Sequence, residues 1–137
     1  KLARQIYAGS DIFLMPSRYE PCGISQMIAM RYGSVPLVRA VGGLHDTVTD
    51  AETGFVFVEA KVKSFNDALR RAFNLFPYHS RWTNMQKAGM SLDYGWQSSA
   101  QKYAELYKKL VDDLRELPKR QVREEPPKPE SLNGENG

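Results

Sequence analysis

The stretch IFLMPSRYEPCGISQMIAMRYG, residues 12–33, decides the fold, because an apolar run leads through a short loop into a helical pattern. The first four residues are continuously apolar and Pro16 ends the run, which is typical of a strand buried on both faces. The loop is followed by a predicted helix over residues 23–32 that ends at Gly33. A buried strand that feeds a helix in this way indicates a parallel sheet with crossover helices.

The same alternation continues on both sides of this stretch. We predict further strands over residues 35–38 and 54–57, with Pro36 near a strand start or where no backbone donor is needed. Ser64 is the expected cap of a helix that runs to Phe76. The other helices are predicted over residues 2–8, 44–49 (a single turn), 81–89 and 96–114.

The predicted fold class is therefore α/β, a Rossmann-like parallel sheet with flanking helices. Only about three strands can be counted, whereas such a sheet usually has five or six. The chain also begins at Lys1 inside a predicted helix. We therefore expect the remaining part of the domain to lie upstream.

Composition argues against several classes of protein. The 137 residues are 42% hydrophobic and 26% charged, as in soluble globular proteins. The net charge of +3 comes from scattered basic residues, so a nucleic-acid partner is not expected. No apolar run approaches the ~20 residues of a membrane span, so a membrane partner is not expected either. Cys22, the single cysteine, can form neither an internal disulfide nor a cysteine-rich metal site, which fits a reducing compartment.

The C-terminal residues differ from the rest in composition. Residues 118–137 hold four of the eight prolines and no aromatic residue, and four basic residues there balance four glutamates. We predict that residues 1–117 form part of a domain and that residues 118–137 form a disordered tail. A tail that docks on a partner remains an alternative, although it contains no defined motif.

The loop that follows the first strand is the candidate site. In open α/β sheets ligands bind beyond the carboxyl ends of the strands, and amides at a helix start favour an anion. Glu20 can accept hydrogen bonds from sugar hydroxyls, and Ser25 can offer its hydroxyl to a phosphate. Backbone amides that can serve hydroxyl or phosphate oxygens belong to Cys22, Gly23 and Ile24. A sugar nucleotide would suit this site, because its leaving pyrophosphate gains charge during transfer.

Residue types alone leave other interpretations of this loop open. Glu20 could simply cap the helix, and Ser25 could be an ordinary polar residue of its first turn. Cys22 could be a reactive thiol, although a small residue whose backbone matters is the favoured interpretation. Trp96 and Tyr107 could stack on a glucan, but their helical spacing favours packing in a core.

Several motifs, taken together, resemble one family. PSRYEPCGISQ at residues 16–26 resembles the PSRFEPCGLTQ block of the bacterial glycogen and plant starch synthases. The likeness continues through AMRYG at 29–33 and VPLVR at 35–39. VGGLHDTV at 41–48 resembles that family's TGGLADTV segment, and TGFVF at 53–57 also matches. The resemblance is strong over about residues 2–57 and weak beyond.

The resemblance implies a partial C-terminal domain of a retaining GT-B glycosyltransferase of family five. Such enzymes transfer glucose from ADP-glucose, or sometimes UDP-glucose, to the nonreducing end of an α-1,4-glucan, without a metal or other cofactor. The implied partners are the sugar nucleotide, the α-glucan and the missing N-terminal catalytic domain. The implied compartment is the bacterial cytoplasm or a plastid, and the cytoplasm is favoured. No transfer is expected from this chain alone, because orientation and preorganised charge need the facing domain.

The resemblance also implies roles for individual residues. Glu20 is the catalytic residue that contacts the donor glucose, and Ser25 stands where the family has threonine near the donor phosphate or ribose. The backbone that holds the glucose hydroxyls belongs to Cys22, Gly23 and Ile24.

Further positions in the motifs bear on the assignment. Gly42 and Gly43 are assigned to the substrate site as residues that shape the loop behind it. Ile28 stands where related GT-B families carry a second glutamate, and this favours the synthases. His45 is interpreted as an ordinary loop residue. Two alternative functions remain: a GT-B transferase that acts on another sugar nucleotide, and a noncatalytic remnant that serves as a binding module.

Overall fold

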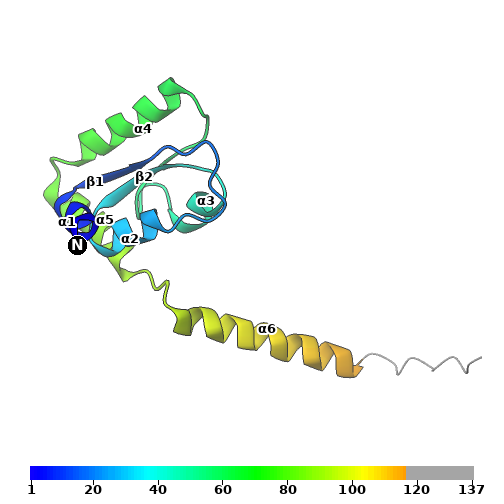
Figure 1. Cartoon of the computed structure of the whole chain (residues 1–137). Helices are drawn as coiled ribbons and strands as arrows, with labels where there is room; N and C mark the ends of the chain where they lie inside the picture. Colours follow the sequence, from blue (N-terminus) through cyan, green and yellow to red (C-terminus); the bar gives the residue numbers. More distant parts are fainter. Residues whose placement is uncertain (117–137) are drawn as a thin grey trace, which may run out of the picture. The chain divides into compact units, whose positions relative to one another are not determined.

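The computed structural model describes residues 1–116 and separates two units (Figure 1). The first unit, Lys1–Gly95, contains the three strands found in the described residues, and the second begins at Trp96 with helix α6 (Trp96–Glu116). The predicted boundary at residue 117 and the predicted tail lie outside the described residues.

The first unit is built on a three-stranded parallel sheet. Strands β1 (Ile12–Met15), β2 (Val35–Arg39) and β3 (Phe55–Phe57) lie in the order β1-β2-β3. Ile12 pairs with Val35 across β1 and β2, and Leu37 pairs with Phe55 across β2 and β3. The predicted strand positions are confirmed to within one residue at each end, and so is the parallel sheet.

Pro36 lies in the central strand, at its second residue. The amide of Val35 donates to the carbonyl of Asp11, on the β1 side. Because successive residues of a strand direct their backbone groups to opposite neighbours, the nitrogen of Pro36 faces the β3 side. Pairing with β3 begins only at Leu37, so no backbone donor is needed at Pro36, as predicted.

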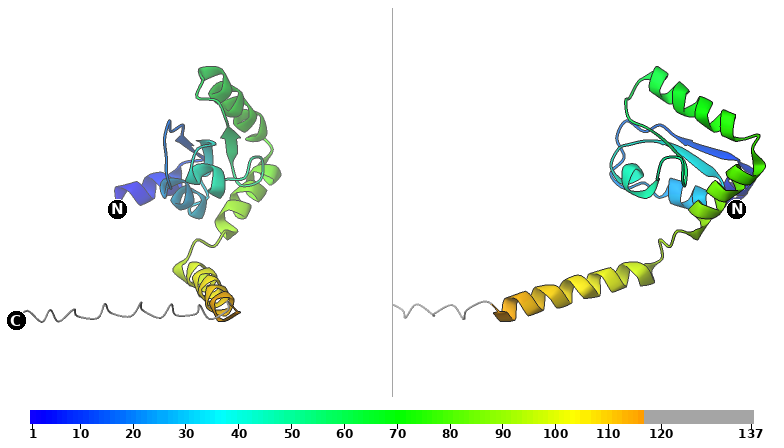
Figure 2. Two further views of the ribbon diagram at one scale, coloured as in Figure 1. Left: turned by 90° about the vertical axis from the view of Figure 1, so that its right-hand side faces the viewer. Right: turned by 180° about the vertical axis from the view of Figure 1, so that it is seen from behind.

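Helices cover both faces of the sheet, and Figure 2 shows α4 on one side with α2 and α3 on the other. In chain order they are α1 (Leu2–Gly9), α2 (Ser25–Arg31), α3 (Gly43–Thr47), α4 (Val62–Leu75) and α5 (His79–Ser91). Alternation along each strand sends side chains into two separate cores. The core beneath α4 and α5 contains Val35, Leu37, Phe55, Phe57, Ala68, Ala72, Trp82 and Met85. The core beneath α2 and α3 contains Met30, Val38, Leu44 and Val48.

Some helix boundaries differ from the sequence predictions. The helix predicted from residue 23 begins at Ser25, because Gly23 has φ +68°, outside the helical region. The prediction of Ser64 as a cap is wrong: α4 begins at Val62 and follows Lys61, which has an extended backbone. The helix predicted from residue 81 begins at His79.

Helix α6, described by itself, carries an apolar face. Trp96, Tyr103, Tyr107, Leu110 and Leu114 recur at steps of three, four and seven residues, which places them on one side. These side chains are exposed on the isolated helix, so the predicted core packing of Trp96 and Tyr107 stays a prediction. Among residues 1–116, no helix is long and apolar enough to cross a membrane.

Candidate functional site

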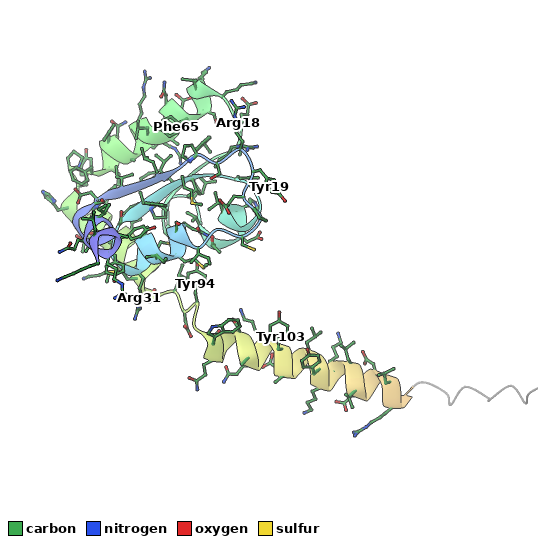
Figure 3. All side chains as sticks on the ribbon, viewed as in Figure 1. Arg18, Tyr19, Arg31, Phe65, Tyr94 and Tyr103 are labelled. Atoms are coloured by element: carbon green, nitrogen blue, oxygen red, sulfur yellow. The ribbon has the colours of Figure 1, made fainter. Side chains whose placement is uncertain are left out.

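Two loops meet at the carboxyl end of the sheet and form the candidate site. The first follows β1 and leads to α2, and the second joins β2 to α3. The amide of Gly43 in the second loop donates to the carbonyl of Pro21 in the first, at 3.2 Å. In Figure 3, Arg18 and Tyr19 mark the first loop, at the end of the sheet where α3 lies. The site therefore combines two sequence motifs that are about twenty residues apart.

Close backbone contact explains the two adjacent glycines of the second loop. A Cβ atom on Gly42 would collide with the carbonyl oxygen of Glu20, and one on Gly43 would collide with that of Cys22. Gly42 also has φ +47°, a conformation that other residues rarely adopt. The structure thus places Gly42 and Gly43 directly behind the first loop, where they set the position of its backbone.

Glu20 is half-buried at the start of the turn. Its carboxylate makes no hydrogen bond or ion pair within residues 1–116. It does not cap α2, because the cap position is Ile24 and the first turn of the helix contains no acidic residue. The alternative of Glu20 as a helix cap is therefore wrong, and its carboxylate oxygens keep their acceptor capacity.

The turn that follows Glu20 presents backbone amides. Gly23 has a left-handed backbone, which reverses the direction of the chain before α2. In the part of the chain that the structure describes, no hydrogen bond is donated by the amides of Cys22, Gly23 and Ile24. The thiol of Cys22 is free and exposed, and Ser25 is the half-buried first residue of α2. The structure thus gathers all the residues predicted for the first loop into one turn.

Gln26 is a residue of the site that the sequence analysis missed. It is completely buried, and its Nε2 donates to the carbonyl of Gly23 and to the hydroxyl of Thr47, both at 3.0 Å. The Thr47 hydroxyl donates in turn to the carbonyl of Gly43. Gln26 and Thr47 therefore join the two loops through side chains. A polar residue within an otherwise apolar helix pattern was the available signal.

Arg39 also supports the first loop and was not predicted to do so. It ends β2, and its guanidinium donates to the carbonyls of Ser17 at 3.2 Å, Arg18 at 2.7 Å and Val58 at 3.2 Å. Five fixed donors make arginine suited to binding several carbonyls together. Arg39 therefore ties the residues after β1 to the end of β3.

A groove of about 610 Å³ adjoins the turn on the α2 side. Ile24 and Ile28 line one wall, and Leu92 and Tyr94 come from the segment after α5. The hydroxyl of Tyr94 donates to the carbonyl of Thr47 at 2.9 Å, and burial raises the pKa of this tyrosine (Figure 3). Ile28 thus places an apolar side chain in this groove.

Polar residues outside the two loops form no cluster typical of a metal centre in the described part of the chain. His45, interpreted as an ordinary loop residue, lies in α3, where a helical turn over residues 44–49 was predicted, and its exposed ring is 3.3 Å from the carboxylate of Asp46. Over the described range, no three histidine, cysteine or acidic residues gather as metal ligands would.

The chain matches a family model and several known proteins over more than half of its length. The family model described as "Glycosyl transferases group 1" matches residues 2–88. A glycogen synthase of Geotalea daltonii is 53% identical over 114 residues, which cover 79% of this chain and 24% of that protein. A glycogen synthase of Pseudomonas fluorescens is 50% identical over 109 residues, 80% of this chain and 21% of that protein.

Among solved structures, the catalytic domain of starch synthase IV from Arabidopsis thaliana, bound to ADP and acarbose, is similar. It has 45% sequence identity and a TM-score of 0.73, over 81% of this chain and 24% of that one. The chain thus spans about a quarter of the length of these relatives. Because the family model covers well over half of the chain, this protein belongs to the glycosyl transferases of group 1.

Proposed function

We propose that this chain is the part of a retaining GT-B glucan synthase that holds the sugar-nucleotide donor. The reaction transfers glucose from ADP-glucose, with UDP-glucose as the alternative donor, to the nonreducing end of an α-1,4-glucan. The support comes from relatives named glycogen synthase and from a starch synthase whose structure contains ADP and acarbose. The resemblance of residues 16–26 and 41–48 to the motifs of these synthases adds to it.

One observation carries the proposal: a half-buried carboxylate without a partner in the described residues stands beside a turn of free amides. Glu20 keeps its acceptor capacity because none of the ion pairs among residues 1–116 includes it. A glucose ring has several hydroxyl donors that such a carboxylate can bind. The amides of Cys22, Gly23 and Ile24 offer donors on the other side of the turn, for hydroxyl or phosphate oxygens.

In this proposal the turn acts on both sides of the bond that breaks. The bond from the anomeric carbon to the diphosphate oxygen is replaced by one to the acceptor hydroxyl oxygen, and the proton of the acceptor hydroxyl passes to the leaving diphosphate oxygen. Glu20 orients the glucose, while the amides and the hydroxyl of Ser25 stabilise the negative charge that gathers on the diphosphate. The reaction needs no metal or other cofactor in this proposal.

The rest of the active site is proposed to come from a facing domain of a longer protein. The described turn lies at an open edge, and Cys22 and Ile24 are exposed. Such a reaction needs water excluded and the acceptor held against the donor. We therefore propose that the chain transfers no glucose by itself and works as part of a two-domain enzyme in the cytoplasm.

A chimera tests this function. The segment of the Geotalea daltonii glycogen synthase that matches this chain over 114 residues is replaced by the present sequence. Transfer of labelled glucose from ADP-glucose to glycogen is then measured, with UDP-glucose in parallel. We expect transfer by the chimera, and a loss of roughly 100-fold or more in kcat with Glu20→Gln.

The matched control is Glu52→Gln, which makes the same change at an exposed glutamate in a turn. It should leave kcat and KM unchanged. A folded chimera that transfers glucose from neither donor would contradict the proposal. Full activity of the Glu20→Gln chimera would contradict the role of Glu20.

A further inference from the structure

We propose that Gln26 is a positioning residue that acts with Thr47 to hold the two loops of the donor site in one arrangement. The inference rests on the proposed function, because it concerns how the same site is kept ready for its donor. Neither residue is placed in contact with the sugar nucleotide. Their effect passes through the backbone of Gly23 and Gly43.

The hydrogen bonds form a continuous chain from one loop to the other. The two hydrogens of the Gln26 Nε2 go to the Gly23 carbonyl and to the Thr47 hydroxyl, each at 3.0 Å. That hydroxyl uses its own hydrogen for the Gly43 carbonyl, at 2.6 Å. Every hydrogen along this path has a defined acceptor, so the bridge between the loops has one direction and one geometry.

The acceptors also determine which way the amide of Gln26 points. With the amide reversed, its oxygen would face the carbonyl oxygens of Gly23 and Cys22, which lie 3.0 and 3.5 Å from the present nitrogen. Two facing acceptors repel and share no hydrogen. The nitrogen therefore belongs on the side of the loop, where it donates both to the Gly23 carbonyl and to the Thr47 hydroxyl.

The other end of the amide shows that core stability does not account for Gln26. Its Oε1 is buried and has no hydrogen-bond partner within the described residues. A buried acceptor without a partner costs free energy, which an apolar side chain of similar volume would avoid. Methionine in place of Gln26 would remove this cost while keeping the volume, so the benefit of glutamine has to lie in its Nε2.

That benefit is the position of the first loop. Besides the close contact at the glycines, a single backbone hydrogen bond, Gly43 to Pro21, joins the loops directly. It leaves the segment from Cys22 to Ile24 without a backbone anchor to the second loop. Gln26 supplies that anchor beside the amides assigned to the donor. A shift of about 1 Å in such groups can reduce a rate by roughly 100-fold.

The experiment is a double-mutant cycle in the active chimera. Gln26→Met and Thr47→Val each break the bridge and keep the side-chain volume nearly constant. We expect either change to raise KM for ADP-glucose roughly tenfold, because the amides assigned to the donor are no longer held in position before it binds. Because either change already breaks the bridge, the double variant should have the same KM as the single ones. Thr47→Ser, which keeps the hydroxyl, should have the KM of the unmodified chimera.

Thr53→Val is the matched control. Thr53 is buried like Gln26, but its hydroxyl bonds only within its own turn, to Thr49. Its replacement should lower the temperature of unfolding and leave KM unchanged. Gln26→Met should raise KM and should not lower the temperature of unfolding. This difference separates a positioning role from a merely structural one.

A second measurement, on the 137-residue chain itself, does not depend on activity. Gln26→Met and Thr47→Val should shift the amide NMR signals of Cys22, Gly23 and Gly43 and speed the hydrogen exchange of the Gly43 amide, which donates to Pro21, whereas Thr53→Val should not. Additive KM effects, or no KM effect in an active chimera, would overturn the inference. An inactive chimera would instead contradict the proposed function, and the NMR signals would still show whether the bridge holds the loops.

Discussion

The Cα atom of Gly43 lies against the carbonyl oxygen of Cys22, with no room for a side chain between the two residues. The contact joins the loop after β1 to the start of α3. It arises because parallel neighbouring strands end at the same edge of the sheet, so the loops that follow them meet. The neighbouring Gly42 makes the same kind of contact with Glu20.

The first prediction concerns this contact. Gly43→Ala should destabilise the first unit by about 1–3 kcal/mol, the usual cost of forcing a group into filled space. The backbone of Cys22 cannot move away without displacing Glu20. Urea unfolding followed by circular dichroism measures the change.

Gly9→Ala is the control for this substitution. Gly9 is the last residue of α1, and a Cβ there would meet no atom within 4 Å. The change should be neutral or stabilising by up to about 1 kcal/mol, because alanine is the better helix former. Equal destabilisation by both substitutions would contradict the close packing at Gly43.

The second prediction concerns Cys22, whose backbone rather than thiol is assigned to the donor. Cys22→Ser should keep the KM for ADP-glucose within about threefold in the chimera, because the amide and the size of the residue are retained. Alkylation of the exposed thiol should inhibit, because it adds bulk to the turn. Because Cys22 is the chain's one cysteine, the Cys22→Ser variant of this segment has no thiol that the alkylating reagent could modify. Loss of activity in Cys22→Ser itself would show that the thiol has a chemical role.

The third prediction concerns the alkaline range. Burial raises the pKa of Tyr94 above its ordinary value of 10.0. The folded state therefore favours the neutral phenol, whose hydroxyl donates to Thr47. This contribution to stability is present below about pH 10 and is lost as pH rises through the raised pKa.

Tyr94→Phe tests that dependence. Between about pH 8 and pH 11, the variant should lose less stability in urea unfolding than the unmodified chain, because it has no phenol to ionise. Tyr19→Phe serves as the control, because Tyr19 is 80% exposed in the loop after β1. If the stability of Tyr94→Phe falls with pH as steeply as that of the unmodified chain, burial of this hydroxyl does not contribute to the pH dependence of stability.

The fourth prediction concerns Arg71, which clamps the turn before β3. Its guanidinium binds both carboxylate oxygens of Asp50, at 3.0 and 2.8 Å, and the carbonyl of Val56 at 2.7 Å. It also lies over the ring of Phe55. Arg71→Lys should lower the free energy of unfolding by about 1 kcal/mol, because an ammonium cannot reproduce the forked geometry of the guanidinium. The loss stays small because the ion pair with Asp50 is partly exposed.

Arg70→Lys makes the same change at the adjacent residue of α4, whose side chain is exposed. It should change stability by no more than about 0.5 kcal/mol. Equal effects at both positions, measured by urea unfolding, would show that the geometry of the Arg71 clamp contributes nothing.

Local patterns explain how much of the fold could be predicted. Apolar runs with proline or glycine at their ends predicted all three strands, and alternation with helices predicted the parallel sheet. The starts of helices were less predictable where the backbone conformation of a single residue set them. The left-handed backbone of Gly23 prevents α2 from starting there. The backbone of Lys61 is extended and α4 begins directly after it, before Ser64.

The sequence by itself determined the kind of fold and the residues of the first loop, because periodicity and motifs are local properties of a chain. Glu20, Cys22, Gly23, Ile24 and Ser25 follow one another, so their meeting in one turn needed no tertiary knowledge.

Only the tertiary structure decided what holds that turn in place. Gln26 and Thr47 are 21 residues apart, and Arg39 is 22 residues from Ser17. Which buried donor meets which carbonyl depends on how β1 and β2 align and how α2 and α3 pack against them. No local pattern contains that information, because it arises when the two crossovers fold onto the same edge of the sheet.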